Sequence, residues 1–75
     1  MDIKISDHAK QRMDERGVSE KQVKSFFDSN EPIISWKISD SDNSVILVDT
    51  VFDEQGFRLV YNALTDTLIT LYPRR

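Results

Sequence analysis

The 75-residue sequence lacks cysteine and any long apolar run, and both absences narrow the classes of protein to which it can belong. Without cysteine, neither disulfide bonds nor a thiolate metal site can support the fold, which excludes a disulfide-stabilised secreted mini-protein. The longest run of apolar residues has four members, Val45 to Val48, whereas a membrane-spanning helix needs about 20. We therefore expect no membrane span and no secretory signal peptide, and a location in the cytoplasm.

Hydrophobic residues make up 39% of the chain and charged residues 31%, a balance typical of a small globular domain. A chain of this length forms one hydrophobic core, so we expect a single domain over residues 1–75. The net charge of −3 is unevenly distributed, because residues 28–56 carry seven acidic residues and one lysine while both ends are slightly basic. A local basic surface could form from the two ends, but a broad basic surface for nucleic acid could not.

The sequence predicts a first helix over residues 7–16. Ser6 or Asp7 can accept hydrogen bonds from the free amides at its start, as N-cap residues do. Gly17 can adopt the left-handed conformation that commonly ends a helix. Both ends of this helix are therefore marked in the sequence.

A second helix is expected over residues 20–29. Ser19 and Gln22 have the spacing of a capping box, and apolar residues at helical spacing follow them. Pro32 prevents the helix from continuing, because proline lacks the amide that a helix interior needs.

Beyond the second helix, the spacing of apolar residues changes from helical to alternating, which is typical of strands. Short segments with the composition of turns separate four such runs. Connections of three to five residues are too short for parallel crossovers, so the strands should pair as an antiparallel meander. The expected strands are residues 33–38, 44–52, 57–63 and 67–72, with turns at 39–43, 53–56 and 64–66.

One face of this meander needs an apolar cover, and the two helices are the elements that can supply it. We therefore expect an α+β fold in which two N-terminal helices pack on a four-stranded antiparallel meander sheet, in the order ααββββ. The side chains expected at this interface are Ile5, Ala9, Met13, Val18, Val23, Phe26 and Phe27.

The side chains with the clearest chemistry lie on the first helix. His8, Arg12 and Arg16 are spaced four residues apart, so they follow one side of that helix. An imidazole can transfer a proton, and guanidinium groups can hold and neutralise a phosphate, as phosphodiester cleavage requires. The same spacing also fits an ordinary solvated helix face on which Asp14 and Glu15 balance the arginines.

Two segments of the sequence resemble a known bacterial domain family, DUF4258. The segment SDHAKQRMDERGVSEKQV, at residues 6–23, is similar to the family's opening pattern H-x-x-x-R-M-x-x-R-G-[IV]-[ST]. The segment FRLVYNALTDTLITLYP, at residues 57–73, is similar to its closing hairpin, in which V-Y-N precedes hydrophobic-T-hydrophobic-Y-P. Together the two segments cover about half of the chain and stand in the expected order.

The resemblance implies a place in the wider group of RelE-like, barnase-like and colicin-like (BECR) ribonuclease toxins. These proteins place one or two helices against a four-stranded antiparallel sheet. The implied activity is cleavage of RNA without a metal or another cofactor, and the implied partner is an antitoxin or immunity protein. The family's polar positions fall on His8, Arg12 and Arg16 in the helix and on Thr70 near the C-terminus.

A ribonuclease of this kind deprotonates the RNA 2′-hydroxyl, stabilises the pentacoordinate phosphate with cations and protonates the 5′-oxygen. His8 would be one proton carrier, and the other would be Tyr61, Tyr72, a lysine or water. Arg58 would hold phosphate together with the two arginines of the helix. Tyr61 and Tyr72 would contact the substrate, and Tyr72 and Trp36 could stack on bases.

Several of these residues also fit structural roles. If Phe57 lies in the core, Arg58 points away from the helices and is a solvated charge on a strand. The hydroxyl of Thr70 could lie on either face of the sheet, and aromatic side chains in the strands of a small domain often belong to its core. The acidic turn at residues 39–43 lacks the spacing of a calcium-binding loop, so we expect no metal site.

Two other functions remain open on the sequence alone. The first is a catalytically silent domain of the same fold that binds a protein partner. The second is an acidic inhibitor or antitoxin-like module whose central strands mimic the charge of nucleic acid. The resemblance favours the ribonuclease, whereas the acidic composition favours the other two.

Overall fold

Both helices begin and end where the sequence predicts. In the computed structural model, which describes residues 3–74, α1 spans Asp7–Arg16 and α2 spans Glu20–Ser29. The side chain of Ser6 accepts a hydrogen bond from the Ala9 amide at 3.0 Å, which satisfies one of the free amides at the start of α1.

The remaining helix ends also have the expected caps. Gly17 ends α1 with a left-handed φ of 71°. Ser19 Oγ accepts from the Gln22 amide at 3.1 Å, and Gln22 Oε1 accepts from the Ser19 amide at 2.9 Å, so the capping box is complete. Asn30, with a φ of 57°, ends α2 two residues before Pro32.

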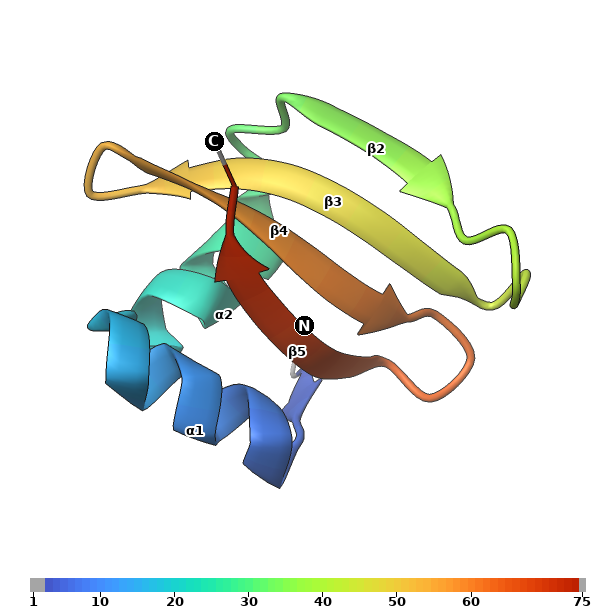
Figure 1. Cartoon of the computed structure of the whole chain (residues 1–75), viewed down its shortest axis with the longest axis horizontal. Coiled ribbons are helices and arrows are strands. Elements are labelled where there is room, and N and C mark those ends of the chain that lie inside the picture. Colours follow the sequence, from blue (N-terminus) through green and yellow to red (C-terminus); the bar gives the residue numbers. More distant parts are fainter. Residues whose placement is uncertain (1–2, 75) are drawn as a thin grey trace.

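Within residues 3–74, five strands form one mixed sheet in the order β1-β5-β4-β3-β2 (Figure 1). Strands β2 to β5 are neighbours in sequence and pair antiparallel, so the predicted meander is present. The strands are β1 (Lys4–Ile5), β2 (Ser35–Ile38), β3 (Val45–Phe52), β4 (Gln55–Asn62) and β5 (Thr67–Pro73).

The expectation of four antiparallel strands was incomplete, because the sheet has a fifth strand, β1, which pairs parallel with β5. Lys4 pairs with Thr67 and Ile5 with Leu68, and both helices lie between β1 and β5 in the sequence. A strand of two residues is too short to show the alternation from which strands are predicted. The short strand leads directly into α1 and places the start of that helix beside β5.

The turn between β3 and β4 is tighter than the predicted turn over residues 53–56. Asp53 and Glu54 form the whole connection, and both have positive φ, 52° and 68°. Such two-residue turns match the twist of antiparallel strands, and their usual residues are asparagine and glycine. Because Glu54 is neither of these, the sequence did not predict a two-residue turn. The tight turn places Asp49 directly opposite Arg58.

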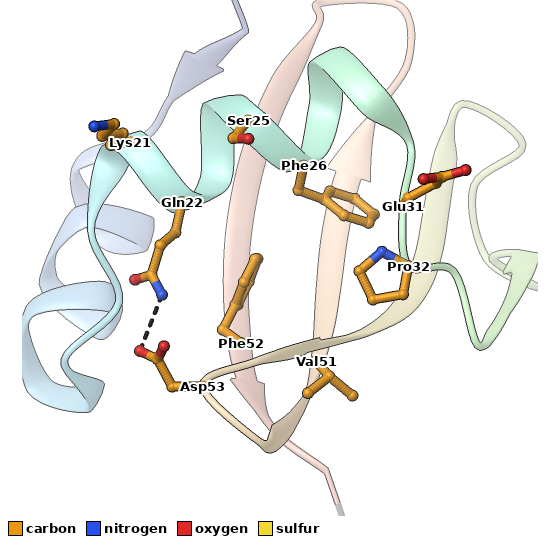
Figure 2. A pocket seen from close by; sticks show the side chains of 9 residues that line it. All are labelled: Lys21, Gln22, Ser25, Phe26, Glu31, Pro32, Val51, Phe52 and Asp53. Carbon is orange, nitrogen blue, oxygen red and sulfur yellow. Dashed lines mark hydrogen bonds between the residues drawn. The ribbon is translucent and has the colours of Figure 1, made fainter.

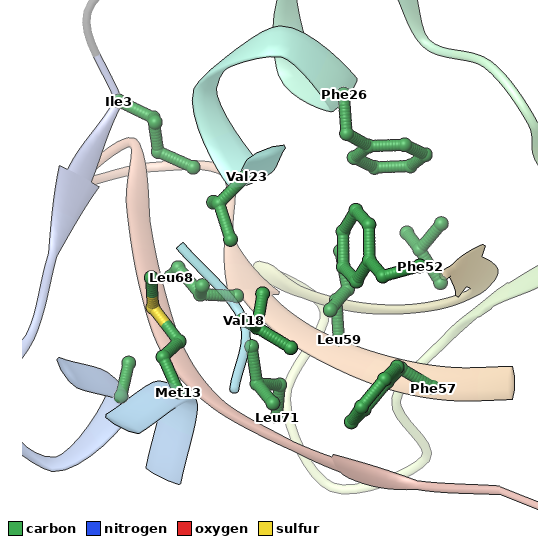
Figure 3. Packing of buried hydrophobic residues seen from close by; sticks show 12 residues of the cluster. Ile3, Met13, Val18, Val23, Phe26, Phe52, Phe57, Leu59, Leu68 and Leu71 are labelled. Carbon is green, nitrogen blue, oxygen red and sulfur yellow. The ribbon is translucent and has the colours of Figure 1, made fainter. Parts of the chain in front are cut away.

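The helices cover one face of the sheet, and the core lies between them and β3, β4 and β5 (Figure 3). Leu59, Leu68 and Leu71 are fully buried beneath the helices. Of the interface side chains expected from the sequence, Ala9, Met13, Val18, Val23 and Phe26 are buried, whereas Ile5 and Phe27 are only partly buried.

Candidate functional site

His8, Arg12 and Arg16 all lie on the exposed surface of α1. The helix packs against β5, with Ala9 and Met13 on its buried side. These three basic side chains are called the α1 row below. The three residues therefore lie on one exposed side of α1, as their spacing predicts, and a ligand can reach them.

The three members of the α1 row differ in their partners. Arg12 Nη1 donates to Glu15 Oε1 at 2.8 Å, in a pair whose side chains are both nearly half exposed. Within residues 3–74, the side chains of His8 and Arg16 form no hydrogen bond or ion pair. An exposed pair such as Arg12–Glu15 contributes little stability, so a phosphate could replace the carboxylate.

Ser6 fixes the first turn of α1 against β5. Its hydroxyl accepts from the Ala9 amide and donates to the carbonyl oxygen of Ile69 at 2.6 Å. Its amide donates to the carbonyl oxygen of Leu68 at 3.1 Å. These bonds hold the backbone two residues before His8, so they determine where the imidazole stands relative to β5.

A change of register in the β4–β5 pairing decides where Thr70 lies. The register shifts by one residue between Val60 and Tyr61, and Leu68 and Leu71 consequently lie on the same, buried face. Thr70, next to Leu71, therefore points to the face away from the helices. The structure does not bring Thr70 together with the α1 row.

The sheet face opposite the helices, called the open face below, holds a buried carboxylate that the sequence pattern did not indicate. Asp49 is 4% exposed. Arg58 donates to it twice, from Nε to Oδ1 at 2.8 Å and from Nη2 to Oδ2 at 3.1 Å. Ser35 Oγ donates to Oδ2 at 2.6 Å, and Arg74 forms an ion pair with the same oxygen. The carboxylate is thus fully paired by two cations and a hydroxyl.

Gly56 allows Arg74 to reach this carboxylate. The amide of Arg74 donates to the carbonyl oxygen of Gly56 at 2.8 Å. A Cβ atom at position 56 would lie 2.8 Å from the carbonyl oxygen of Arg74, closer than side chains normally approach. The glycine thus permits the close backbone approach that places Arg74 beside Asp49.

Arg58 is not the solvated strand charge that the sequence also allowed. Its side chain is 22% exposed and forms an ion pair with Asp49. Phe57, the preceding residue of β4, is buried beneath the helices, so the side chain of Arg58 lies on the opposite face of the sheet. Tyr72 pairs with Arg58 across β4 and β5 and shares the open face with it. The sequence did contain an indication of this ion pair, because Asp49 is the one charged residue in β3. Arg58 could be identified as its partner only if the length of the β3–β4 turn was known.

We expect the Asp49–Arg58 pair to matter for stability. Replacing Asp49 with alanine should lower the free energy of unfolding by about 3 kcal/mol, because Arg58 then loses its partner in a mostly buried position. Replacing Arg74 with alanine should cost about 1 kcal/mol or less, since that side chain is 46% exposed. Urea unfolding measures both losses, and equal losses from Asp49→Ala and Arg74→Ala would contradict the larger role assigned to the Asp49–Arg58 pair.

Tyr61 belongs to neither surface. It lies on the helix side, with its ring centroid 5.0 Å from that of Phe27, and its hydroxyl donates to the carboxylate of Asp66. The hydrogen bond to Asp66, with smaller effects of burial and of the negative charge, raises the pKa of Tyr61 from 10.0 to about 12. A phenol that holds its proton so tightly is a weak general acid at neutral pH.

The raised pKa of Tyr61 gives a testable pH dependence. The folded protein binds the phenol proton more tightly than the unfolded chain, so this stabilisation is complete below pH 10 and is lost as the pH rises towards about 12. The ultraviolet titration of phenolate should show a late ionisation that Tyr61→Phe removes. Asp66→Asn should lower the pKa of Tyr61 towards 10.0, and an unchanged titration in that variant would contradict the assigned cause.

The cleft in Figure 2 contains none of the predicted site residues. It lies between α2 and the end of β3, where Gln22 Nε2 donates to Asp53 Oδ2 at 3.0 Å. In the part of the chain that the structure describes, no three His, Asp or Glu side chains are grouped so as to bind a metal ion. Over the same residues, neither helix has the length and apolar character needed to cross a membrane.

The fold and the α1 row define a small α+β domain with exposed basic side chains on its first helix. Residues 5–73 match the family described as "Domain of unknown function (DUF4258)". This match spans nearly the whole chain, so the protein belongs to the DUF4258 family. No curated protein and no solved structure gives a match. The family resemblance predicted from the two terminal segments is confirmed, and the link to ribonuclease toxins stays a prediction.

Proposed function

We propose that this domain is a metal-independent endoribonuclease that cleaves RNA by attack of the 2′-hydroxyl on the adjacent phosphate. The observation that carries the proposal is the exposed α1 row, in which an imidazole stands in line with two guanidinium groups on one helix. Membership of the DUF4258 family supports it through the resemblance to RelE-like, barnase-like and colicin-like toxins.

In this proposal His8 takes the proton from the 2′-hydroxyl, and Arg12 and Arg16 bind the phosphate that develops extra negative charge. Neighbours four residues apart on a helix lie about 6 Å apart along its axis, so one phosphate can contact more than one member of the α1 row. The guanidinium groups bind phosphate oxygens through paired hydrogen bonds. Attack of the 2′-oxygen breaks the bond to the 5′-oxygen and leaves a 2′,3′-cyclic phosphate.

Water supplies the proton for the departing 5′-oxygen in this mechanism. Tyr61 is unsuited to the task because Asp66 holds its proton, and Tyr72 lies on the open face. The α1 row is exposed, so water reaches it directly. The imidazole of His8 then returns its proton to solvent, and the enzyme is restored.

The open face has a supporting role in the proposal. In this proposal Arg58 and Tyr72 contact the RNA chain there. Thr70, expected among the catalytic residues, shares that face and lies away from the α1 row, so the proposal gives it no part in the reaction at the α1 row. Arg58 and Arg74 share a single carboxylate, so this face retains positive charge. The proposed partners are RNA and an antitoxin or immunity protein, in the cytoplasm.

The alternative is a protein-binding or inhibitor module of the same fold without catalytic activity. Large apolar side chains exposed around β2 favour it, because such patches often mark protein interfaces. An inhibitor is favoured by the seven acidic residues between positions 28 and 56.

Incubation of the purified domain with end-labelled RNA of mixed sequence tests the proposed function, with and without EDTA and beside DNA of the same sequence. We expect the RNA to be cut equally in both conditions and the DNA to stay intact, because the reaction needs the 2′-hydroxyl and no metal ion. Intact RNA at high concentrations of folded domain, or protection of RNA by EDTA, would contradict the proposal.

A further inference from the structure

An apolar groove lies between the end of α2 and strands β2 and β3, and no residue of α1 lines it. Its walls include Phe27 from α2, Trp36 from β2 and Ile46 from β3. Trp36, the single tryptophan of the sequence, is 62% exposed, and Ile33 beside it is 44% exposed. The groove is therefore open to solvent and presents large apolar side chains.

The groove is bordered by a free edge of the sheet. Within residues 3–74, β2 pairs with β3 and with no other strand, and it lies at the edge of the sheet away from α1 (Figure 1). The Ser39 amide donates to the carbonyl oxygen of Val45 in β3. In an antiparallel pair only every second residue bonds to the neighbouring strand, so the amides of Trp36 and Ile38 point away from β3. These two residues thus offer backbone hydrogen bonds beside the groove.

Acidic residues flank β2 in the sequence. Glu31 precedes the strand, and Asp40 and Asp42 follow it. Ser44 donates to Asp42 Oδ1 through its hydroxyl at 2.6 Å and its amide at 2.9 Å, which lowers the pKa of Asp42 and keeps it charged. An occupant with basic residues at its ends would complement this charge.

The same acidic residues argue against a second copy of this chain in the groove. If two β2 strands paired antiparallel about a two-fold axis, the start of each strand would lie beside the end of the other. Glu31 of one copy would then approach Asp40 and Asp42 of the other, and like charges would oppose the contact.

We propose that the groove and the free edge of β2 form a docking site for an extended segment of a partner protein with basic ends and alternating apolar residues. The segment adds as a strand beside β2 and hydrogen-bonds to the backbone of Trp36 and Ile38. Its apolar side chains occupy the groove, and its basic ends meet Glu31 and Asp40. The inference deepens the partner part of the proposed function and does not depend on RNA cleavage, because the groove and the α1 row share no residue.

A synthetic peptide probe tests the charge and the groove together. It has two arginines at each end and alternating valine and threonine between them, and a reference peptide carries glutamates in place of the arginines. We expect the basic peptide to shift the fluorescence of Trp36 in a saturable way. The acidic peptide should bind at least about tenfold more weakly, since opposite charges favour and like charges oppose the same contact.

A pair of variants at one position tests strand addition. Ile38→Ala removes the side chain and keeps the amide that faces the free edge, whereas Ile38→Pro also removes that amide and leaves the bonds to β3 in place. Both should fold, because Ile38 is 51% exposed. The proline variant should bind a labelled basic peptide about fivefold to tenfold more weakly than the alanine variant, the effect of one backbone hydrogen bond.

Three outcomes would overturn the inference: no binding of the basic peptide by folded protein, equal affinities of the alanine and proline variants, or equal affinities of the two peptides. A dimer in sedimentation that Ile38→Pro abolishes would also overturn it, since the occupant would then be a second copy. Each peptide result is read beside the RNA assay. Peptide binding without cleavage overturns the proposed nuclease alone, and cleavage without peptide binding overturns the docking site alone.

Discussion

Replacing His8 with alanine should reduce the rate of RNA cleavage by roughly two to four orders of magnitude, the usual contribution of a general acid or base. The imidazole lies on the exposed surface of α1, and its side chain makes no hydrogen bond within the described residues, so its loss should leave the fold intact. The measurement is kcat/KM on a labelled RNA, with thermal unfolding of the same preparation as the check on folding.

Two further substitutions on α1 serve as controls for His8→Ala. Lys10→Ala removes an exposed charge from the same helix outside the α1 row and should change the rate little. Arg12→Lys keeps the positive charge but loses the paired hydrogen bonds of a guanidinium, so its rate should fall less than that of the His8 variant. A His8→Ala protein as active as the wild type would remove His8 from the mechanism.

Phe26→Ala should lower the free energy of unfolding by about 3 to 5 kcal/mol, the range found for large aromatic side chains in protein cores. Phe26 is 4% exposed and packs edge-on against Phe27 and Phe52, with ring centroids 5.1 and 6.2 Å away. Small domains are stable by only about 5 to 15 kcal/mol, so the variant should lose a large part of its stability. Urea unfolding monitored by circular dichroism measures the loss.

Phe27→Ala is the matched control for this prediction, because it removes the same side chain from the neighbouring position. Phe27 is only partly buried, so we expect a clearly smaller loss than for Phe26→Ala. The expectation from the sequence that both phenylalanines lie in the core was correct for Phe26 and too strong for Phe27. A loss from Phe27→Ala equal to that from Phe26→Ala would contradict the packing described above.

The helix boundaries could be predicted because the groups that set them are close in sequence. Ser6 caps α1 and Gly17 ends it, while Ser19 and Gln22 form a capping box for α2. Each of these signals involves residues within one helical turn of each other. The antiparallel meander was predictable for a similar reason, since each strand follows its neighbour after a short connection.

The features that the sequence did not reveal depend on contacts between distant segments. β1 is a strand only because it pairs with β5, more than 60 residues later. Whether Thr70 faces the helices depends on the register shift between β4 and β5. The partners of Asp49 depend on a turn of two residues, Asp53 and Glu54, whose composition does not indicate that length.

The candidate site could be predicted in the part that lies on a single helix. His8, Arg12 and Arg16 are exposed together because helical spacing alone places them on one side of α1. The strand residues Arg58 and Thr70 could not be placed with them from the pattern alone, because strand pairing decides which face each residue occupies. The structure puts both on the open face, away from the helices.

The chemical nature of the ends produced from RNA tests the proposed nuclease most directly. Mass spectrometry of RNA incubated with the purified domain in EDTA should show 2′,3′-cyclic phosphates on one side of each cut and 5′-hydroxyls on the other. These ends should be absent with His8→Ala protein at the same concentration. RNA that stays intact in the presence of folded wild-type domain, or cuts that carry 5′-phosphates, would contradict the proposed mechanism.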